Sequence, residues 1–218
     1  MNKFIDHTLL KADATTADIE KLCKEAIEHQ FYSVCVNSGY VALAKHLTQG
    51  SGVKVCSVVG FPLGAMASEA KMFETQNALS NGADEIDMVI NVGYLKSGNI
   101  DQVRAEIATI KQLVGKERVL KVIIETCYLT DEEKRLACRL SVEAGADFVK
   151  TSTGFGTGGA TPEDITLMRE AVAGKAKLKA SGGVRDYATA KQYIDLGVSR
   201  IGTSNGIAII KGEKGEGY

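Results

Sequence analysis

The chain has few of the residues that bind metal ions. Its three histidines, His7, His29 and His46, do not cluster with cysteines or acidic residues at metal-ligand spacings. The five cysteines are widely spaced and form no C-x-x-C pair: Cys23, Cys35, Cys56, Cys127 and Cys138. An odd number of unpaired thiols fits a reduced, cytosolic protein without a zinc site. We therefore expect no metal and a cytoplasmic location.

Charge of one sign and long apolar segments are lacking as well. Lysine and arginine total 26, aspartate and glutamate total 27, and the net charge is −1. Such a balance produces no field that attracts nucleic acid or an anionic membrane, so an anionic ligand must be bound by local geometry. No apolar run approaches membrane length, and the first residues show no apolar signal segment. We expect no nucleic-acid partner and no membrane partner.

Short apolar strands alternate with amphipathic segments along the whole chain. The expected strands are 4–8, 33–36, 53–59, 85–90, 119–125, 148–151, 177–180 and 200–202. The expected helices are 16–29, 39–47, 67–80, 100–114, 131–144, 162–172, 187–196 and 205–210. Thr130 and Thr161 precede acidic first turns and are expected to cap their helices.

An internal repeat favours a barrel. Residues 79–87 align with 142–150 and, more weakly, with 194–202, and each copy passes from a helix through glycine into a strand. Eight such units predict a single-domain (β/α)8 TIM barrel over residues 1–211, followed by a flexible tail at 212–218. The alternative is an open, doubly wound sheet built from the same units. The count of eight and the lack of a GxGxxG after the first strand favour the barrel.

Strand alternation predicts a charged cluster at the barrel axis. Asp87, Lys121, Lys150 and Lys179 each fall on the face expected to point inward. Each alone is more often a structural ion pair, and a single strand lysine can also extend to solvent from an edge strand. Together they predict several buried amines and few acids. Burial and neighbouring positive charge favour a neutral amine, which can attack a carbonyl as a Schiff-base nucleophile.

Glycine-rich loops follow the last two expected strands, at 181–185 and 202–206. Barrels often bind phosphate there through exposed backbone N–H groups. Glycine also serves plain turns, so the signal lies in two consecutive loops rather than in one. The expected ligand is a small phosphorylated carbonyl compound. Arg185 is close to these loops, but it can equally cap the following helix from the surface.

Six segments resemble the signatures of the deoxyribose-phosphate aldolase family, which are class I aldolases. They are 150–154 (KTSTG), 179–185 (KASGGVR), 82–87 (GADEID), 5–10 (IDHTLL), 59–64 (VGFPLG) and 121–126 (KVIIET). The similarity covers essentially the whole chain, in order. It implies reversible cleavage of 2-deoxy-D-ribose 5-phosphate to D-glyceraldehyde 3-phosphate and acetaldehyde, without a metal or another cofactor. It is also compatible with a homodimer or a homotetramer.

The resemblance also implies roles for individual residues. Lys150 would be the Schiff-base nucleophile, Lys179 the second lysine that perturbs it and relays protons, and Asp87 the acid/base group. The expected phosphate-binding residues are Gly154, Gly182, Gly183, Gly202 and Ser204.

Further alternatives stay open at this stage. Cys35 would point toward the site, or serve only as a small buried apolar residue. Tyr218 would lie in a disordered end, or reach the substrate if the tail folds over the barrel mouth. Another Schiff-base sugar-phosphate aldolase or transaldolase, and a non-enzymatic sugar-phosphate-binding barrel, are the competing functions.

Overall fold

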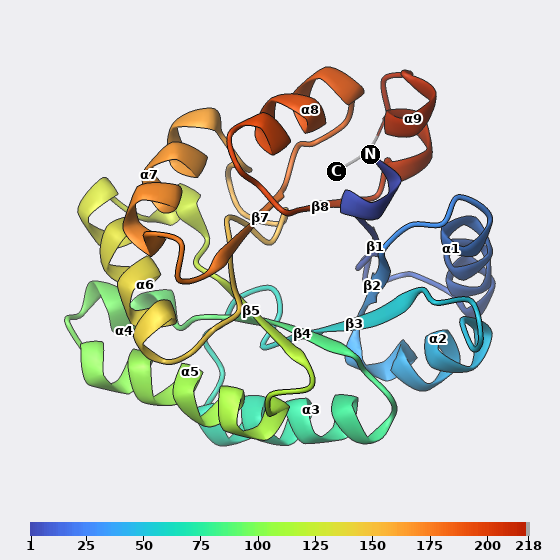
Figure 1. Cartoon of the computed structure of the whole chain (residues 1–218). Helices are drawn as coiled ribbons and strands as arrows, with labels where there is room; N and C mark the ends of the chain where they lie inside the picture. The colour runs from blue at the N-terminus through green and yellow to red at the C-terminus, as the bar shows by residue number, and fades with distance from the viewer. Residues whose placement is uncertain (217–218) are drawn as a thin grey trace.

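Eight parallel strands pair in chain order and close into a barrel, because β8 pairs with β1 (Figure 1). The computed structural model describes residues 1–216. The strands are β1 (Ile5–Leu9), β2 (Ser33–Val36), β3 (Lys54–Val59), β4 (Glu85–Val89), β5 (Val119–Ile123), β6 (Phe148–Lys150), β7 (Lys177–Ser181) and β8 (Arg200–Thr203). The predicted (β/α)8 barrel is confirmed, and the open sheet is excluded.

Helices surround the barrel and follow the strands (Figure 1). They are α1 (Thr16–Glu28), α2 (Val41–Leu47), α3 (Ser68–Ser80), α4 (Val92–Lys96), α5 (Ile100–Val114), α6 (Asp131–Glu143), α7 (Pro162–Val172), α8 (Tyr187–Asp195) and α9 (Gly206–Lys211). Three 3₁₀ turns add to them: η1 (Asn2–Phe4), η2 (Ser38–Tyr40) and η3 (Thr126–Tyr128). Thr130 and Thr161 cap α6 and α7 as predicted. The short helix α4 was not predicted.

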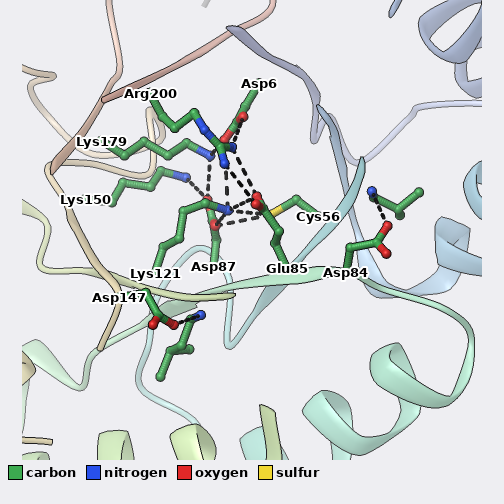
Figure 2. A network of polar contacts seen from close by, with 12 residues as sticks. Asp6, Cys56, Asp84, Glu85, Asp87, Lys121, Asp147, Lys150, Lys179 and Arg200 are labelled. Carbon is green, nitrogen blue, oxygen red and sulfur yellow. Dashed lines mark hydrogen bonds and ion pairs between the residues drawn. The ribbon is translucent and has the colours of Figure 1, made fainter. Parts of the chain in front are cut away.

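The internal repeat has a structural cause. Its glycines, Gly82, Gly145 and Gly197, have φ angles of 98°, 82° and 102°, which favour glycine after a helix end. The aspartates two positions after the first two glycines, Asp84 and Asp147, also act alike (Figure 2). Each carboxylate accepts a hydrogen bond from a backbone N–H near the start of the preceding strand, Val55 for Asp84 and Leu120 for Asp147. Each also accepts one from a helix lysine, Lys45 for Asp84 and Lys111 for Asp147. The repeat therefore fixes the turn that leads into a strand.

The apolar core lies between the outer face of the barrel and the helices, because the strand residues that point outward are mostly valine, isoleucine and leucine. The barrel interior carries charged side chains instead. No helix within residues 1–216 is both long and apolar enough to cross a membrane.

Part of the predicted tail is attached to the barrel. The Glu213 amide donates to the Ala208 carbonyl and the Gly215 amide donates to the Arg185 carbonyl, both at 2.8 Å. Tyr218 lies outside the described residues.

Candidate active site

Asp87 on β4 lies at the centre of a buried polar network (Figure 2). Its Oδ2 accepts hydrogen bonds from Lys150 Nζ at 2.9 Å and from Lys179 Nζ at 2.8 Å. Its Oδ1 accepts from Lys121 Nζ at 2.8 Å and from the thiol of Cys56 at 3.1 Å. One carboxylate therefore holds three lysines from three different strands.

Strand register brings these side chains together. Asp87 is paired with Lys121 across β4 and β5, and Lys150 is paired with Lys179 across β6 and β7. Because side chains alternate between the two faces of a strand, residues in register point the same way. The prediction that these four residues project into the barrel is confirmed.

Three further charged residues complete the cluster and were not found from the sequence. Asp6 Oδ2 lies 2.6 Å from Lys179 Nζ, and Glu85 Oε2 lies 2.6 Å from Lys121 Nζ. Arg200 forms ion pairs with Asp6 at 2.8 Å and with Glu85 at 3.0 Å. The sequence therefore predicted too large an excess of amines over acids. Four cations (Lys121, Lys150, Lys179, Arg200) face three carboxylates (Asp6, Glu85, Asp87), which leaves one positive charge in excess when all are ionised.

The guanidinium of Arg200 contacts two aromatic rings as well as two acids. It lies 3.1 Å from the ring centroid of Tyr32 and 5.5 Å from that of Phe148. Such cation–π contacts are strongest where water is excluded, and Arg200 is buried. The arginine therefore neutralises Asp6 and Glu85 at the edge of the cluster.

The charges in the cluster stabilise one another. Burial alone would raise the pKa of Asp87, but the ammonium groups of Lys121, Lys150 and Lys179 outweigh it and hold that pKa well below its ordinary value. Burial alone would lower the pKa of Lys179, but Asp6 and Asp87 raise it above its ordinary value. The two carboxylates therefore favour the ammonium form of Lys179.

Lys150 lies where the cluster meets a cavity. A small cavity of about 30 Å³ lies at the ends of β6, β7 and β8. Its lining residues are Thr8, Leu10, Lys150, Thr153, Gly154, Ser181, Gly182, Gly183, Val184, Gly202, Thr203 and Ser204. Neither Lys121 nor Lys179 lines it, and both are completely buried. The cavity brings Lys150 together with all five residues predicted to bind phosphate, whose roles stay predictions.

Two of the glycines are needed for close approach. Gly182 has a φ of +82°, and a Cβ there would lie 2.9 Å from the Cα of Gly159. A Cβ on Gly202 would lie 3.0 Å from Cε of Lys179. Gly182 thus lets two loops touch at the cavity, and Gly202 leaves room for the lysine inside the barrel.

Glu125 is another residue near the site that was not assigned a role from the sequence. It follows β5 with a φ of 54°, a backbone conformation uncommon outside glycine. Its carboxyl group accepts the backbone N–H of Thr153 at 3.1 Å and forms a short hydrogen bond with the hydroxyl of Thr153. Burial raises the pKa of Glu125. The contact fixes the loop that follows Lys150.

The remaining predicted residues have simpler positions. Cys35 points inward and is completely buried, as expected. Arg185 is exposed, and its carbonyl accepts a hydrogen bond from Gly215. A larger cavity of about 650 Å³ lies between α1 and α9 and shares Thr8 and Ser204 with the small one. No lysine of the cluster lines this larger cavity, so it is not the place where the buried charges act.

Comparison with known proteins agrees with this geometry. A family model described as DeoC/LacD family aldolase matches residues 1–211. A deoxyribose-phosphate aldolase from Brevibacillus brevis is 60% identical over 220 residues, covering 100% of this chain and 99% of the relative.

Solved structures agree as well. The structure titled "QR15, an Aldolase" superposes with a TM-score of 0.92 at 42% identity, covering 96% of this chain and 94% of the other. A tetrameric deoxyribose phosphate aldolase from Aeropyrum pernix superposes with a TM-score of 0.88 at 33% identity, covering 96% and 89%. The chain belongs to the DeoC/LacD family of aldolases.

Proposed function

We propose that the chain cleaves 2-deoxy-D-ribose 5-phosphate reversibly to D-glyceraldehyde 3-phosphate and acetaldehyde, with Lys150 as the Schiff-base nucleophile. One observation carries the assignment of the lysine. Among the described residues, Lys150 alone both contacts Asp87 through its ammonium nitrogen and lines the glycine-walled cavity. The names of the relatives support the substrate.

The proposed reaction starts with attack of the neutral Lys150 amine on C1 of the sugar aldehyde. Asp87 lies 2.9 Å from Lys150 Nζ and is placed to exchange protons with the carbinolamine, directly or through water. Loss of water gives a protonated imine. The electron pair of the C2–C3 bond then moves into the imine, the C3 hydroxyl loses its proton, and glyceraldehyde 3-phosphate leaves. Hydrolysis of the remaining enamine releases acetaldehyde.

The phosphate would lie at the far end of the cavity from Lys150. Gly154, Gly182, Gly183, Gly202 and Ser204 line that cavity and present little side chain, so an anion could approach their backbone closely. The chain has almost no net charge, so such local donors, rather than the overall field, would select the phosphorylated sugar.

Trapping with borohydride tests the assignment. Incubation with acetaldehyde and sodium borohydride should reduce the imine to a stable ethyl-lysine, which peptide mass spectrometry should locate at Lys150. A transaldolase would instead form its adduct from a dihydroxyacetone donor. A non-enzymatic sugar-phosphate-binding barrel would form no adduct with either compound.

Lys179→Leu is expected to shift trapping to higher pH. Without the Lys179 ammonium, Asp87 holds the Lys150 ammonium more strongly, so the neutral amine forms only in more alkaline solution. We expect the pH of half-maximal trapping to rise by about one to three units while turnover stays low. The measurement is adduct yield against pH, with the exposed Lys191→Leu as a matched control. An adduct on Lys179 in the unaltered protein would reverse the two assignments.

Exhaustive treatment with a chelator is expected to leave the rate of cleavage unchanged, because the protonated imine serves as the electron sink. Within residues 1–216, Cys35, Cys56 and Asp87 are the group of potential metal ligands that lie within 4.8 Å of one another. Three lysines already engage that carboxylate. Loss of activity on chelation, restored by Zn²⁺, would instead indicate a metal-dependent aldolase.

A homodimer or homotetramer in the cytoplasm is also proposed. The Aeropyrum pernix relative is described as a tetramer. Leu63 and Phe73 are 78% and 71% exposed, which supports a contact between copies at α3 and the loop before it. Light scattering of the purified protein tests this assembly.

A further inference from the structure

Two cysteines form a pair inside the barrel, beneath the proposed nucleophile. Cys35 on β2 and Cys56 on β3 are register partners on adjacent strands, and both are completely buried. Their sulfur atoms lie within 4.8 Å of each other. Neighbouring strands lie about 4.8 Å apart, and a disulfide needs Cα atoms about 4.4–6.8 Å apart. The Cα separation of the two register partners therefore falls in the range that a disulfide needs.

The surroundings of the pair give the two sulfurs different chemistry. The neighbouring Cys56 thiol, assisted by the charges of Lys179 and Lys150, lowers the pKa of Cys35. Burial, the Cys35 contact and the charge of Asp87 raise the pKa of Cys56 well above its ordinary value. Since the thiolate is the reactive form, Cys35 is the nucleophile of the pair and Cys56 is its proton-bearing partner.

We propose that Cys35 and Cys56 are an oxidation site that peroxides convert reversibly to a disulfide. The Cys35 thiolate attacks one oxygen of hydrogen peroxide, the O–O bond breaks, and the products are a sulfenic acid and hydroxide, which takes up a proton to form water. The Cys56 sulfur then attacks the sulfenic sulfur, the S–O bond breaks, and the hydroxyl group leaves with the Cys56 proton as a second water. Two thiols lose two electrons in total, and a dithiol reductant restores them.

Leu10 separates the thiols from the small cavity. It lines that cavity and belongs to the same small buried cluster as Cys35, Cys56 and Val58. It is nearly buried, at 4% exposure, so it controls access from the cavity to the pair. Replacing it with alanine should open a path for a molecule as small as peroxide.

The disulfide would act on the proposed active site through Asp87. The Cys56 sulfur lies 3.1 Å from Asp87 Oδ1 and 3.4 Å from Lys121 Nζ. Bonding to Cys35 moves this sulfur toward β2 and removes its hydrogen, so Asp87 loses one donor and the lysines shift around it. We expect cleavage to slow by about tenfold, which is the effect of losing one hydrogen bond to a charged group. This consequence rests on the proposed function, whereas disulfide formation does not.

The experiment follows formation of the disulfide and the rate of cleavage in the full-length protein. Reduced protein is treated with hydrogen peroxide, remaining thiols are alkylated after denaturation, and peptides are mapped by mass spectrometry. A peptide pair linked through Cys35 and Cys56, lighter by two hydrogens than its reduced form, is expected. Its appearance should parallel the fall in activity, and dithiothreitol should reverse both. Leu10→Ala should form the link severalfold faster.

Single variants distinguish oxidation of Cys35 and Cys56 from oxidation of other residues. Cys35→Ser and Cys56→Ser should show no dithiothreitol-reversible loss relative to their own untreated activity. Cys127→Ser, which removes a thiol outside the pair, should still form the link. Cys35 and Cys56 that remain alkylatable after peroxide has oxidised Cys127 would overturn the proposal. A link that forms without loss of activity would leave the oxidation site standing and overturn its effect on Asp87.

Discussion

Lys150→Ala and Lys150→Arg are both expected to abolish aldol cleavage, by about a thousandfold or more, while the barrel stays folded. Alanine removes the amine. Arginine keeps a positive charge next to Asp87 but remains protonated and cannot form an imine. Steady-state cleavage of 2-deoxy-D-ribose 5-phosphate measures the loss, and circular dichroism checks the fold.

The arginine variant is the sharper of the two, because it preserves the charge count of the cluster. Lys111→Arg, which changes a partly buried lysine paired with Asp147 outside the cluster, is a matched control and should retain activity. If Lys150→Arg kept more than a trace of cleavage while its fold was intact, the Schiff-base assignment would be wrong.

Asp87→Asn is expected to have the largest effect on stability, with a free energy of unfolding lower by about 3–5 kcal/mol. The carboxylate is completely buried and holds Lys121, Lys150 and Lys179, so its neutral replacement leaves buried ammonium groups with too little negative charge. Urea unfolding at neutral pH measures the change. Glu133→Gln, which breaks the partly exposed Lys96–Glu133 pair, should cost no more than about 1 kcal/mol.

The same variant should alter the response to acid. The pKa of Asp87 is lowered by folding, so the stability that its charge contributes is present above the unfolded pKa of about 3.9 and is lost as the pH falls toward the folded pKa. Asp87→Asn should therefore flatten the fall of unfolding free energy below about pH 4. An acid-unfolding curve as steep as that of the unaltered protein would contradict the network as the source of this stability.

Periodicity explains why much of the fold and of the cluster could be predicted from the sequence. Alternation of side chains along the strands predicted which way four residues point: Asp87, Lys121, Lys150 and Lys179. Glycine after each helix made the internal repeat recognisable. Glu85 could have been found in the same way, because it is two residues from Asp87 on the same strand and points to the same side.

Asp6 and Arg200 could not be placed by the same reasoning. The expected strands 4–8 and 200–202 were short and mixed polar with apolar residues, so alternation did not say which face was inward. Their direction is decided by the pairing of β8 with β1, which depends on closure of the whole barrel. The helix α4 was missed for a different reason. It has only five residues and too few turns to show a helical period.

The pairing of Asp6 with Arg200 has a consequence for how the protein acquires its activity during synthesis. The two residues are 194 positions apart, and their contact joins the first strand to the last. Contacts between distant residues form late, because closing a long loop costs chain entropy. In the folded protein, the carboxylate of Asp6 pairs with both Lys179 and Arg200. Until β8 leaves the ribosome, Arg200 is not available for this pair. A nascent chain that already contains Lys150 therefore still lacks one of the four cations of the cluster around this lysine, and we expect catalysis to begin only when the barrel closes.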